Sequence, residues 1–186
     1  MRHGTWTARS GLLAALAAVV IGASTCMAQP ETFTLNGVVK DHDSKKVMAK
    51  VTVVAKDTLE KGSADRTVYG RTDQRGKYKL SLAYDGVYRV EYWAQGHTAK
   101  RVIIDLTRVK EKDREGGNTI ALEIALLPTL LNVDYSTYKE PVAVCRFDKK
   151  AKMFKWDAEY SESRAMDLSQ VKKEQHAERK ARPLQH

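Results

Sequence analysis

The feature that most constrains the fold is a stretch in which two alternating segments, at residues 77–82 and 87–94, follow a short turn at residues 73–76. A period of two indicates β-strands with one buried face, and a turn that ends in glycine indicates a tight reversal of the chain. The stretch therefore predicts antiparallel β-structure, with residues 67–72 and 77–82 forming a β-hairpin. The residues expected to point inward are Tyr78, Leu80, Leu82, Tyr88, Val90 and Tyr92.

The same alternation recurs along the chain and predicts seven strands before Pro128. These strands are expected at residues 32–40, 50–56, 67–72, 77–82, 87–94, 98–106 and 118–127. Short strands joined by turns, with no helical period between them, exclude a parallel α/β sheet. The expected fold is mainly β: a seven-stranded antiparallel β-sandwich of the Ig-like or transthyretin-like kind over residues 31–128.

The sequence changes character after residue 128. Residues 129–157 are expected to form a linker and a small β-hairpin, with strands at 141–147 and 152–156. Proline at the start of the first of these strands favours an edge position, because proline has no N–H for a sheet ladder. The hairpin is therefore predicted as an appendage to the sandwich.

Residues 158–186 are predicted to form a basic tail that begins as a helix. Glutamate, lysine, arginine, alanine and glutamine predominate, and Asp157 is placed to cap the helix N-terminus. The apolar stripe is thin, with Ala165, Leu168 and Val171 as its main members. It disappears past Lys172, so we expect the helix to dock at its start and to fray beyond that residue.

The N-terminus has the order of a secretory signal peptide over residues 1–28. A short basic region with Arg2 and Arg9 precedes an apolar run at 12–23, and small residues precede a cleavage point after Ala28. The run is about 12 residues long, whereas a membrane-spanning helix needs about 20. We therefore expect an exported protein, located in the periplasm or associated with the outer membrane or cell surface.

Two cysteines bear on the compartment. Lipidation of Cys26 is an alternative to simple cleavage, but Ala23 and Thr25 depart from a bacterial lipoprotein signal, and membrane association is expected only if Cys26 is lipidated. Cleavage of the signal would leave Cys145 as a single cysteine, so no internal disulfide could form. Alternation places Cys145 on the face of Phe147, as a small buried hydrophobe.

The formal net charge of the chain is +9 at pH 7. A positive protein favours anionic partners. The charge is spread along the chain and an exported protein rarely meets nucleic acid, so we expect no nucleic-acid binding. An envelope protein with an acidic surface is the partner that this charge favours, and a glycan is the alternative.

Four segments, at residues 36–41, 49–54, 70–80 and 88–97, resemble the carboxypeptidase-regulatory-like domain family. The resemblance covers residues 31–128 and implies a transthyretin-like, or prealbumin-like, sandwich. Domains of this family look like non-catalytic modules on peptidases, outer-membrane transporters and surface proteins, notably of Bacteroidetes-type bacteria. The resemblance implies no peptidase activity here, because that activity would need a separate catalytic domain with zinc ligands.

The residues themselves predict no catalytic, cofactor-binding or metal-binding site. Four histidines follow the signal segment, and none lies in a His-x-x-Glu or His-Glu-x-x-His arrangement. The loop from Asp41 to Ser44 is interpreted as a polar turn. A cation site there is the alternative, although Lys45 and Lys46 repel cations and the glycine and distal glutamate of an EF-hand are missing.

The candidate contacts with a ligand or partner are one histidine, two tryptophans and the basic residues of the tail. Trp93 falls on the face opposite Tyr92, and His97 lies at a strand entrance after Gly96. The full set is Trp93, His97, Trp156, Lys172, Lys173, Arg179 and Lys180.

These patterns predict a non-enzymatic, exported cell-envelope module that mediates protein–protein interaction or assembly. A carbohydrate-binding module that uses the exposed aromatic residues is the main alternative. A transthyretin-like hydrolase of a small cyclic amide is a remote alternative. It would need clustered histidine and arginine at a tetramer channel, and the sandwich contains only His42 and His97.

Overall fold

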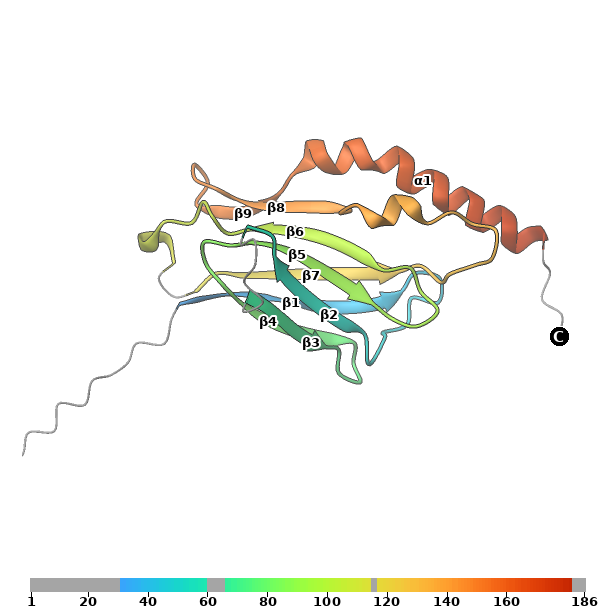
Figure 1. Ribbon diagram of the computed structural model, residues 1–186, viewed down its shortest axis with the longest axis horizontal. Helices are drawn as coiled ribbons and strands as arrows, with labels where there is room; N and C mark the ends of the chain where they lie inside the picture. Colours follow the sequence, from blue (N-terminus) through green and yellow to red (C-terminus); the bar gives the residue numbers. More distant parts are fainter. Residues whose placement is uncertain (1–30, 60–65, 115–116, 182–186) are drawn as a thin grey trace, which may run out of the picture.

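The computed structural model describes residues 31–59, 66–114 and 117–181. This part of the chain forms nine strands, two short 3₁₀ helices and one α-helix (Figure 1). The predicted signal peptide at 1–28, with Cys26, lies outside the described residues. The elements, in chain order, are β1 (Thr32–Asp41), β2 (Thr52–Asp57), β3 (Thr67–Arg71), β4 (Lys77–Ala83), β5 (Val87–Trp93), β6 (Lys100–Asp105), η2 (Glu111–Asp113), β7 (Thr119–Leu126), η3 (Ser136–Lys139), β8 (Ala143–Asp148), β9 (Met153–Trp156) and α1 (Ala158–Ala181).

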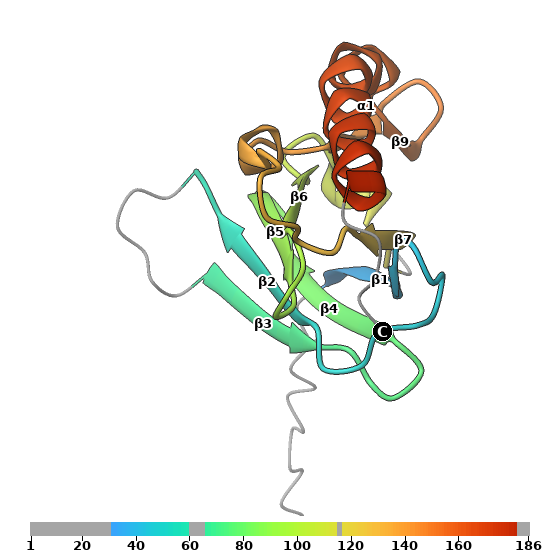
Figure 2. The same cartoon turned by 90° about the vertical axis from the view of Figure 1, so that its right-hand side faces the viewer.

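The strands form two sheets that pack face to face as a β-sandwich (Figures 1 and 2). One sheet has the order β4-β1-β7, and the other has the order β3-β2-β5-β6-β8-β9. The expected mainly β sandwich is confirmed. The finer prediction of seven antiparallel strands is wrong, because the described residues form nine strands and β1–β7 and β6–β8 are parallel pairs.

The extra strands come from the C-terminal hairpin, which is part of the sandwich and no appendage. Strand β8 pairs with β6, where Val102 lies opposite Ala143, and β9 then forms the edge. Ring contact between Phe33 and Phe154, at 4.8 Å between centroids, joins the hairpin to the opposite sheet. Without β8, the backbone groups of β6 would face solvent as an open sheet edge. That requirement depends on the assembled sheet, so local alternation did not predict it.

The predicted hairpin around residues 73–76 is also wrong in its pairing. Strand β3 pairs with β2 and strand β4 pairs with β1, so the turn crosses from one sheet to the other. The turn itself is tight: the Gly76 N–H donates to the Asp73 carbonyl at 3.0 Å, and Gly76 has a φ of 69°. A hairpin and a crossing of this kind share a tight turn and inward apolar residues, so alternation alone does not separate them.

The core lies between the sheets and contains the six predicted inward residues of β4 and β5. The hydroxyls of Tyr78 and Tyr92 meet at 2.9 Å, and the Tyr78 hydroxyl also donates to the Leu122 carbonyl at 3.1 Å. Burial raises the pKa of Tyr78 to about 12, so this phenol stays neutral. Cys145 is fully buried, as predicted, and burial raises the pKa of its thiol to about 12.

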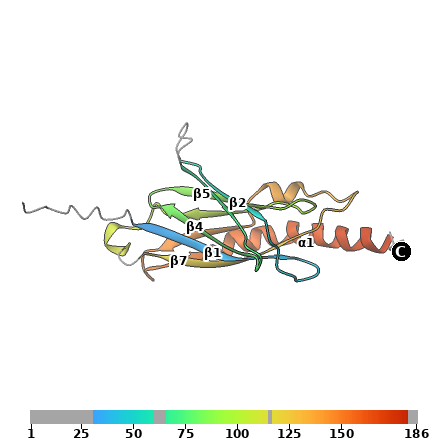
Figure 3. The same ribbon diagram turned by 90° about the horizontal axis from the view of Figure 1, so that it is seen from below.

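Helix α1 lies along the long axis of the sandwich (Figures 1 and 3). Asp157 caps it as predicted, since its Oδ1 accepts from the Tyr160 N–H at 3.0 Å. Val171 is buried and Leu168 packs beside it, but Ala165 is exposed, contrary to the expected stripe. The expected fraying is wrong for residues 172–181, because the helix continues to Ala181, and the rest of the predicted tail, at 182–186, lies outside the described residues. Within the described ranges, no helix is both long and apolar enough to cross a membrane.

The stripe of α1 that faces the body mixes apolar and polar side chains. The spacing of apolar residues alone therefore predicted too short a docked segment. The members of the stripe follow helical spacing and are Arg164, Leu168, Val171, Gln175 and Arg179.

Candidate functional site

The predicted contact residues lie in separate regions of the molecule. Trp93 ends β5 on the outer face of the six-stranded sheet. His97 and Arg179 lie where the C-terminal part of α1 meets the loops of the body. Trp156 lies on edge strand β9, at a position whose register places it on the face of Cys145. The structure therefore does not bring the predicted residues into one site.

One half of the outer face of the six-stranded sheet is covered. Val144 points outward from β8, yet it is only 5% exposed, because α1 and η3 lie over this half (Figure 2). Two arginines of the outer face hold η3 in place. Arg89 donates to the Lys139 carbonyl at 2.5 Å, and Arg101 donates to the Tyr138 carbonyl at 2.9 Å.

The other half, over β3, β2 and the end of β5, has no helix above it among the residues described, and we call it the open face. Its register places Val54 between Tyr69 and Glu91, and Thr52 between Arg71 and Trp93. The members of the open face are Thr52, Val54, Lys56, Tyr69, Arg71, Glu91 and Trp93.

Two aromatic side chains dominate the open face. Tyr69 is 74% exposed and Trp93 is 51% exposed. Large aromatic residues exposed together on one face of a sheet are unusual on a surface without a partner and are enriched in interfaces. Sequence reasoning identified Trp93 but missed Tyr69, although the alternation of Tyr69 with half-buried Val68 carried the signal.

The open face carries uncompensated positive charge. Its one acid, Glu91, is paired with Arg101 at 2.6 Å. Arg71 donates to the Lys50 carbonyl at 3.3 Å, a bond that leaves its charge unneutralised. In the described part of the chain, neither Lys56 nor Arg71 has a carboxylate partner. An acidic surface would complement this patch.

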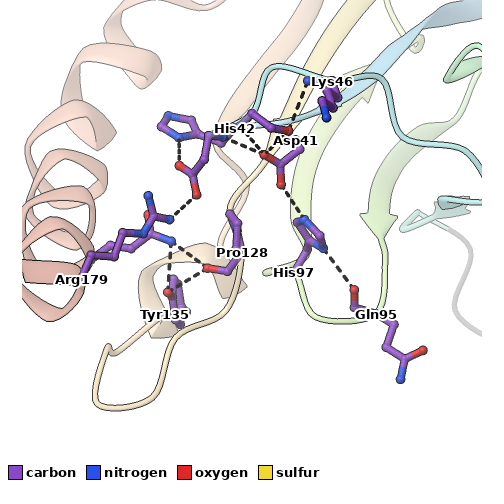
Figure 4. A network of polar contacts seen from close by, with 11 residues as sticks. Asp41, His42, Lys46, Gln95, His97, Pro128, Tyr135 and Arg179 are labelled. Atoms are coloured by element: carbon purple, nitrogen blue, oxygen red, sulfur yellow. Dashed lines mark hydrogen bonds and ion pairs between the residues drawn. The ribbon is translucent and has the colours of Figure 1, made fainter. Parts of the chain in front are cut away.

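A second region is the seam between α1 and the body, shown in Figure 4. Asp41 is its centre: Oδ1 accepts the Ser44 N–H at 2.6 Å and the Ser44 hydroxyl at 2.9 Å, while Oδ2 lies 2.9 Å from Nε2 of His97. Burial alone would raise the pKa of Asp41, but the bonds from Ser44 and His97 outweigh it and hold this pKa well below its usual range. The polar turn expected at Asp41–Ser44 is thereby confirmed.

The seam continues to the helix through Asp43. Its carboxylate contacts the Arg179 guanidinium and lies 3.1 Å from Nδ1 of His42. Burial opposes ionisation, yet the bonds from Arg179 and His42 lower the pKa of Asp43. One turn earlier, Gln175 donates to the Pro128 carbonyl at 2.7 Å. These contacts attach α1 to the end of the sandwich.

The seam does not have the geometry of nucleophilic catalysis. The Ser44 hydroxyl donates to Asp41 and not to an imidazole, whereas a serine nucleophile needs a base at its own oxygen. Both ring nitrogens of His97 face acceptors, with Nδ1 lying 3.1 Å from the Gln95 carbonyl. Within the described ranges, no group of three or more His, Cys, Asp or Glu side chains is placed to hold a metal ion.

The lysines on α1 and the lysine beneath it differ in exposure. Lys172, Lys173 and Lys180 are exposed on the helix. Lys100 lies beneath the helix, 5.6 Å from the centre of the Tyr138 ring. Burial lowers the pKa of Lys100 to about 8, and the positive charge of Lys172 adds to this effect.

No known protein-family model matches the chain, and no curated protein matches it. Solved structures that resemble it include catechol 1,2-dioxygenase from Acinetobacter sp. ADP1, with a TM-score of 0.43 and 14% identity over 63% of this chain and 59% of that chain. The shaft pilin SpaA from Lactobacillus rhamnosus GG has a TM-score of 0.39 and 13% identity, over 53% of this chain and 48% of the pilin.

The Bacillus anthracis TIE protein has a TM-score of 0.39 and 17% identity, over 53% of this chain and 18% of that protein. The chain therefore spans less than two thirds of the length of each of these structures.

Proposed function

We propose that this chain is a non-catalytic, exported binding module that docks a partner protein with an acidic surface. The observation that carries the proposal is the open face, where Tyr69 and Trp93 are exposed beside the half-buried Val54. Tyrosine, tryptophan and arginine are the residues most enriched at the energetic centres of protein interfaces. The open face offers all three on one side of a paired sheet.

Charge and mixed polarity favour a protein over a sugar at the open face. Strand β2 separates Tyr69 from Trp93, and Thr52 and Val54 fill the surface between them. The resulting patch mixes aromatic, aliphatic and polar side chains, as protein interfaces commonly do. The unneutralised charges of Lys56 and Arg71 would steer and orient an acidic partner.

The compartment and family are parts of the same proposal. The signal-like segment at residues 1–28 supports export to the periplasm or the cell surface. The four segments that resemble the carboxypeptidase-regulatory-like family lie within the two-sheet sandwich, which supports a module of that kind. The occupied nitrogens of His97 and the buried thiol of Cys145 support a non-catalytic role.

Photo-crosslinking tests the proposal directly. A p-benzoylphenylalanine in place of Tyr69 places the probe on the open face, and the same probe in place of Met166 is the control. Met166 is 79% exposed on α1, so both probes meet solvent equally well. We expect one dominant protein adduct from position 69 in envelope fractions and none of it from position 166.

Quantitative binding to the captured partner sharpens this test. Trp93→Ala and Arg71→Glu should each weaken binding by about 10-fold or more, equivalent to about 1.4 kcal/mol, as expected of interface hot spots. Met166→Ala should leave it within about 2-fold. The proposal is wrong if position 69 gives no protein adduct. Adducts with glycan alone would instead support the alternative that the open face binds carbohydrate.

A further inference from the structure

Strand β7 forms an unprotected edge of the three-stranded sheet. It pairs with β1 on one side, and the described residues place no strand on its other side (Figure 3). The strand has eight residues, TIALEIAL, and contains no proline. Its single charged residue, Glu123, pairs with Lys40 of the neighbouring strand at 2.6 Å. A long apolar edge of this kind is a template for a further strand.

The other edge strands have features that discourage such pairing. Strand β9 is only four residues long and carries Lys155, and β4 carries Lys77 and Lys79. Strand β3 has five residues and includes Gly70 and Arg71. Short length and cationic side chains protect a sheet edge from a further strand. Among the described strands at sheet edges, β7 is the one that has neither feature.

The backbone groups of β7 divide between its two sides. The Thr34 N–H donates to the Asn118 carbonyl, and the His42 N–H donates to the Leu126 carbonyl, both at 2.8 Å. These bonds show that the even-numbered residues of β7 face β1, so the N–H and C=O groups of the odd-numbered residues point to the free edge. In the described ranges, no backbone hydrogen bond outside the sheet ladders reaches these outward-pointing groups. They belong to Thr119, Ala121, Glu123 and Ala125.

Apolar side chains lie along the same edge on its core side. Ile120 and Leu122 pack against the core but are only half-buried, whereas Ile124, farther along β7, is 5% exposed. A strand added to β7 would place its own side chains beside Ile120 and Leu122 and would remove apolar surface from water. Backbone and side chains of this edge therefore both favour a further strand.

A second copy of β7 fits this edge in an antiparallel arrangement about a two-fold axis. The outward-pointing backbone groups of one strand must meet those of the other, so odd-numbered residues lie opposite odd-numbered residues. With the axis at Leu122, the pairing covers residues 119–125. Ala121 then lies opposite Glu123 of the second copy and exchanges two hydrogen bonds with it. On the core side, the two Leu122 side chains meet.

Charge and length select this register among the alternatives. An axis at Glu123 would place two carboxylates directly opposite each other, where like charges are destabilising. An axis at Ala121 would shorten the pairing to residues 119–123. With the axis at Leu122, each Glu123 faces an alanine and keeps Lys40 of its own chain. The formal net charge of the chain is +9, and no lysine or arginine of β7 adds to the repulsion between two copies.

We propose that two copies of this chain associate through β7, so that their three-stranded sheets join into one six-stranded sheet. This interface is distinct from the open face, which belongs to the other sheet. The dimer presents two open faces, so a partner that engages both is held more tightly than a partner that engages one.

Sedimentation velocity tests the association, with protein purified from cells that express the full chain. We expect the sedimentation coefficient to shift from that of a monomer to that of a dimer as the concentration rises from about 1 µM to about 100 µM. A monomer throughout this range would overturn the proposal. Trp93→Ala should leave the shift unchanged, so failure of this interface and failure of the open face are distinguishable.

A proline at the free edge should prevent dimer formation over the same range. Ala121→Pro removes an outward N–H and no bond to β1, and proline is tolerated at such edge positions. Lys79→Pro is the matched control at the edge of β4. The Val39 N–H donates to the Gly76 carbonyl, so even-numbered residues of β4 face β1 and Lys79 faces away. Equal effects of the two variants on the dimer would overturn the proposal.

Disulfide trapping tests the register and does not depend on the folding of the proline variant. Leu122→Cys places two cysteines directly opposite each other at a non-hydrogen-bonded pair, where Cα atoms lie about 4.5 Å apart and a disulfide can form. Thr119→Cys is the control, because position 119 is exposed but lies at opposite ends of the paired segment in the two copies. Cys145 is fully buried in both variants.

Under mild oxidation, we expect a disulfide-linked dimer from position 122 and none from position 119. Equal cross-linking at the two positions would show random collision. Cross-linking at position 119 alone would show a different contact. Either result, or no cross-linking at position 122, would overturn the proposal.

Discussion

The sandwich core and the α1 seam hold the molecule together by different means. In the core, side chains such as Leu35, Val53 and Leu126 are completely buried between the two sheets. At the seam, only a few apolar side chains meet, and polar groups make most of the remaining contacts. Arg164 donates to the Thr137 carbonyl at 2.6 Å, for example, and Gln175 contacts the Pro128 carbonyl.

The difference shows which part of the structure can open alone. The strands share one buried apolar core, so we expect them to unfold together in one cooperative transition. A hydrogen bond contributes only about 1 kcal/mol net, and an exposed ion pair contributes less. We therefore expect α1 to detach from the body while the sandwich stays folded.

The largest predicted effect is in the core, at Gly37→Ala. Gly37 lies between β4 and β7, and a Cβ there would lie 1.9 Å from the Leu122 carbonyl oxygen. Backbone cannot yield as a flexible side chain can, so β1 and β7 would have to separate at this point. We expect a loss of about 3 kcal/mol or more in the free energy of unfolding, measured by urea denaturation.

Gly96→Ala provides the control for this substitution. A Cβ at Gly96 meets no atom within 4 Å, but the φ of Gly96 is 74°, which disfavours alanine. The loss should be about 1 kcal/mol, from backbone strain alone. If the two variants are equally stable, close packing of β1 against β7 is not what requires glycine at position 37.

Much of the core could be predicted from the sequence because its signal is local. Tyr78, Leu80 and Leu82 alternate with lysine and serine, and all three are buried as expected. The strand pairings were harder to predict from the sequence, since they depend on residues far apart in the chain. Gly37 illustrates this, because the contact that requires glycine comes from Leu122 in a strand 85 positions later (122 − 37).

A matched pair of valine substitutions sharpens the comparison between core and seam. Val53 and Val171 are both buried, one in β2 and one in α1. Each change to alanine removes the same apolar atoms and should cost about 2 kcal/mol where it acts. Val53→Ala should lower the global free energy of unfolding, whereas Val171→Ala should mainly speed hydrogen exchange in α1.

The readout is the exchange of backbone amides in β5 and in α1, followed in the same sample by mass spectrometry. In Val171→Ala, amides of α1 should lose protection while those of β5 keep it. In Val53→Ala, both should lose protection together. Joint loss in the two variants would mean that α1 and the sandwich unfold as one unit, contrary to the comparison.

The seam and the open face were harder to predict, because what they bury or expose is decided by tertiary contacts. The expected helix stripe included Ala165, yet Arg164 faces the body, since a guanidinium can reach a backbone carbonyl that alanine cannot. Trp93 was identified because alternation placed it opposite the core face. That it lies on the uncovered half of the sheet follows only from where η3 and α1 pack.

The smallest predicted effect is the acid sensitivity of the seam. The folded-state pKa of Asp41 lies below its ordinary value of 3.8, so the native state binds this proton less tightly than the unfolded chain does. The corresponding stability is present above that ordinary value and is lost as the pH falls through the lower, folded-state pKa. Asp41→Asn should cost at most about 1 kcal/mol at neutral pH, because solvent screens the carboxylate.

Urea unfolding at a series of pH values tests this effect through the difference between Asp41→Asn and the natural chain. The difference should shrink toward zero as the pH falls below 3.8, because protonation removes the charge that asparagine already lacks. Ser169→Lys, on an exposed position of α1, raises the net charge by the same one unit and controls for general repulsion. A difference that stays constant through acid pH would show that the ionised Asp41 contributes nothing, and that Ser44 and His97 hold the turn by neutral hydrogen bonds alone.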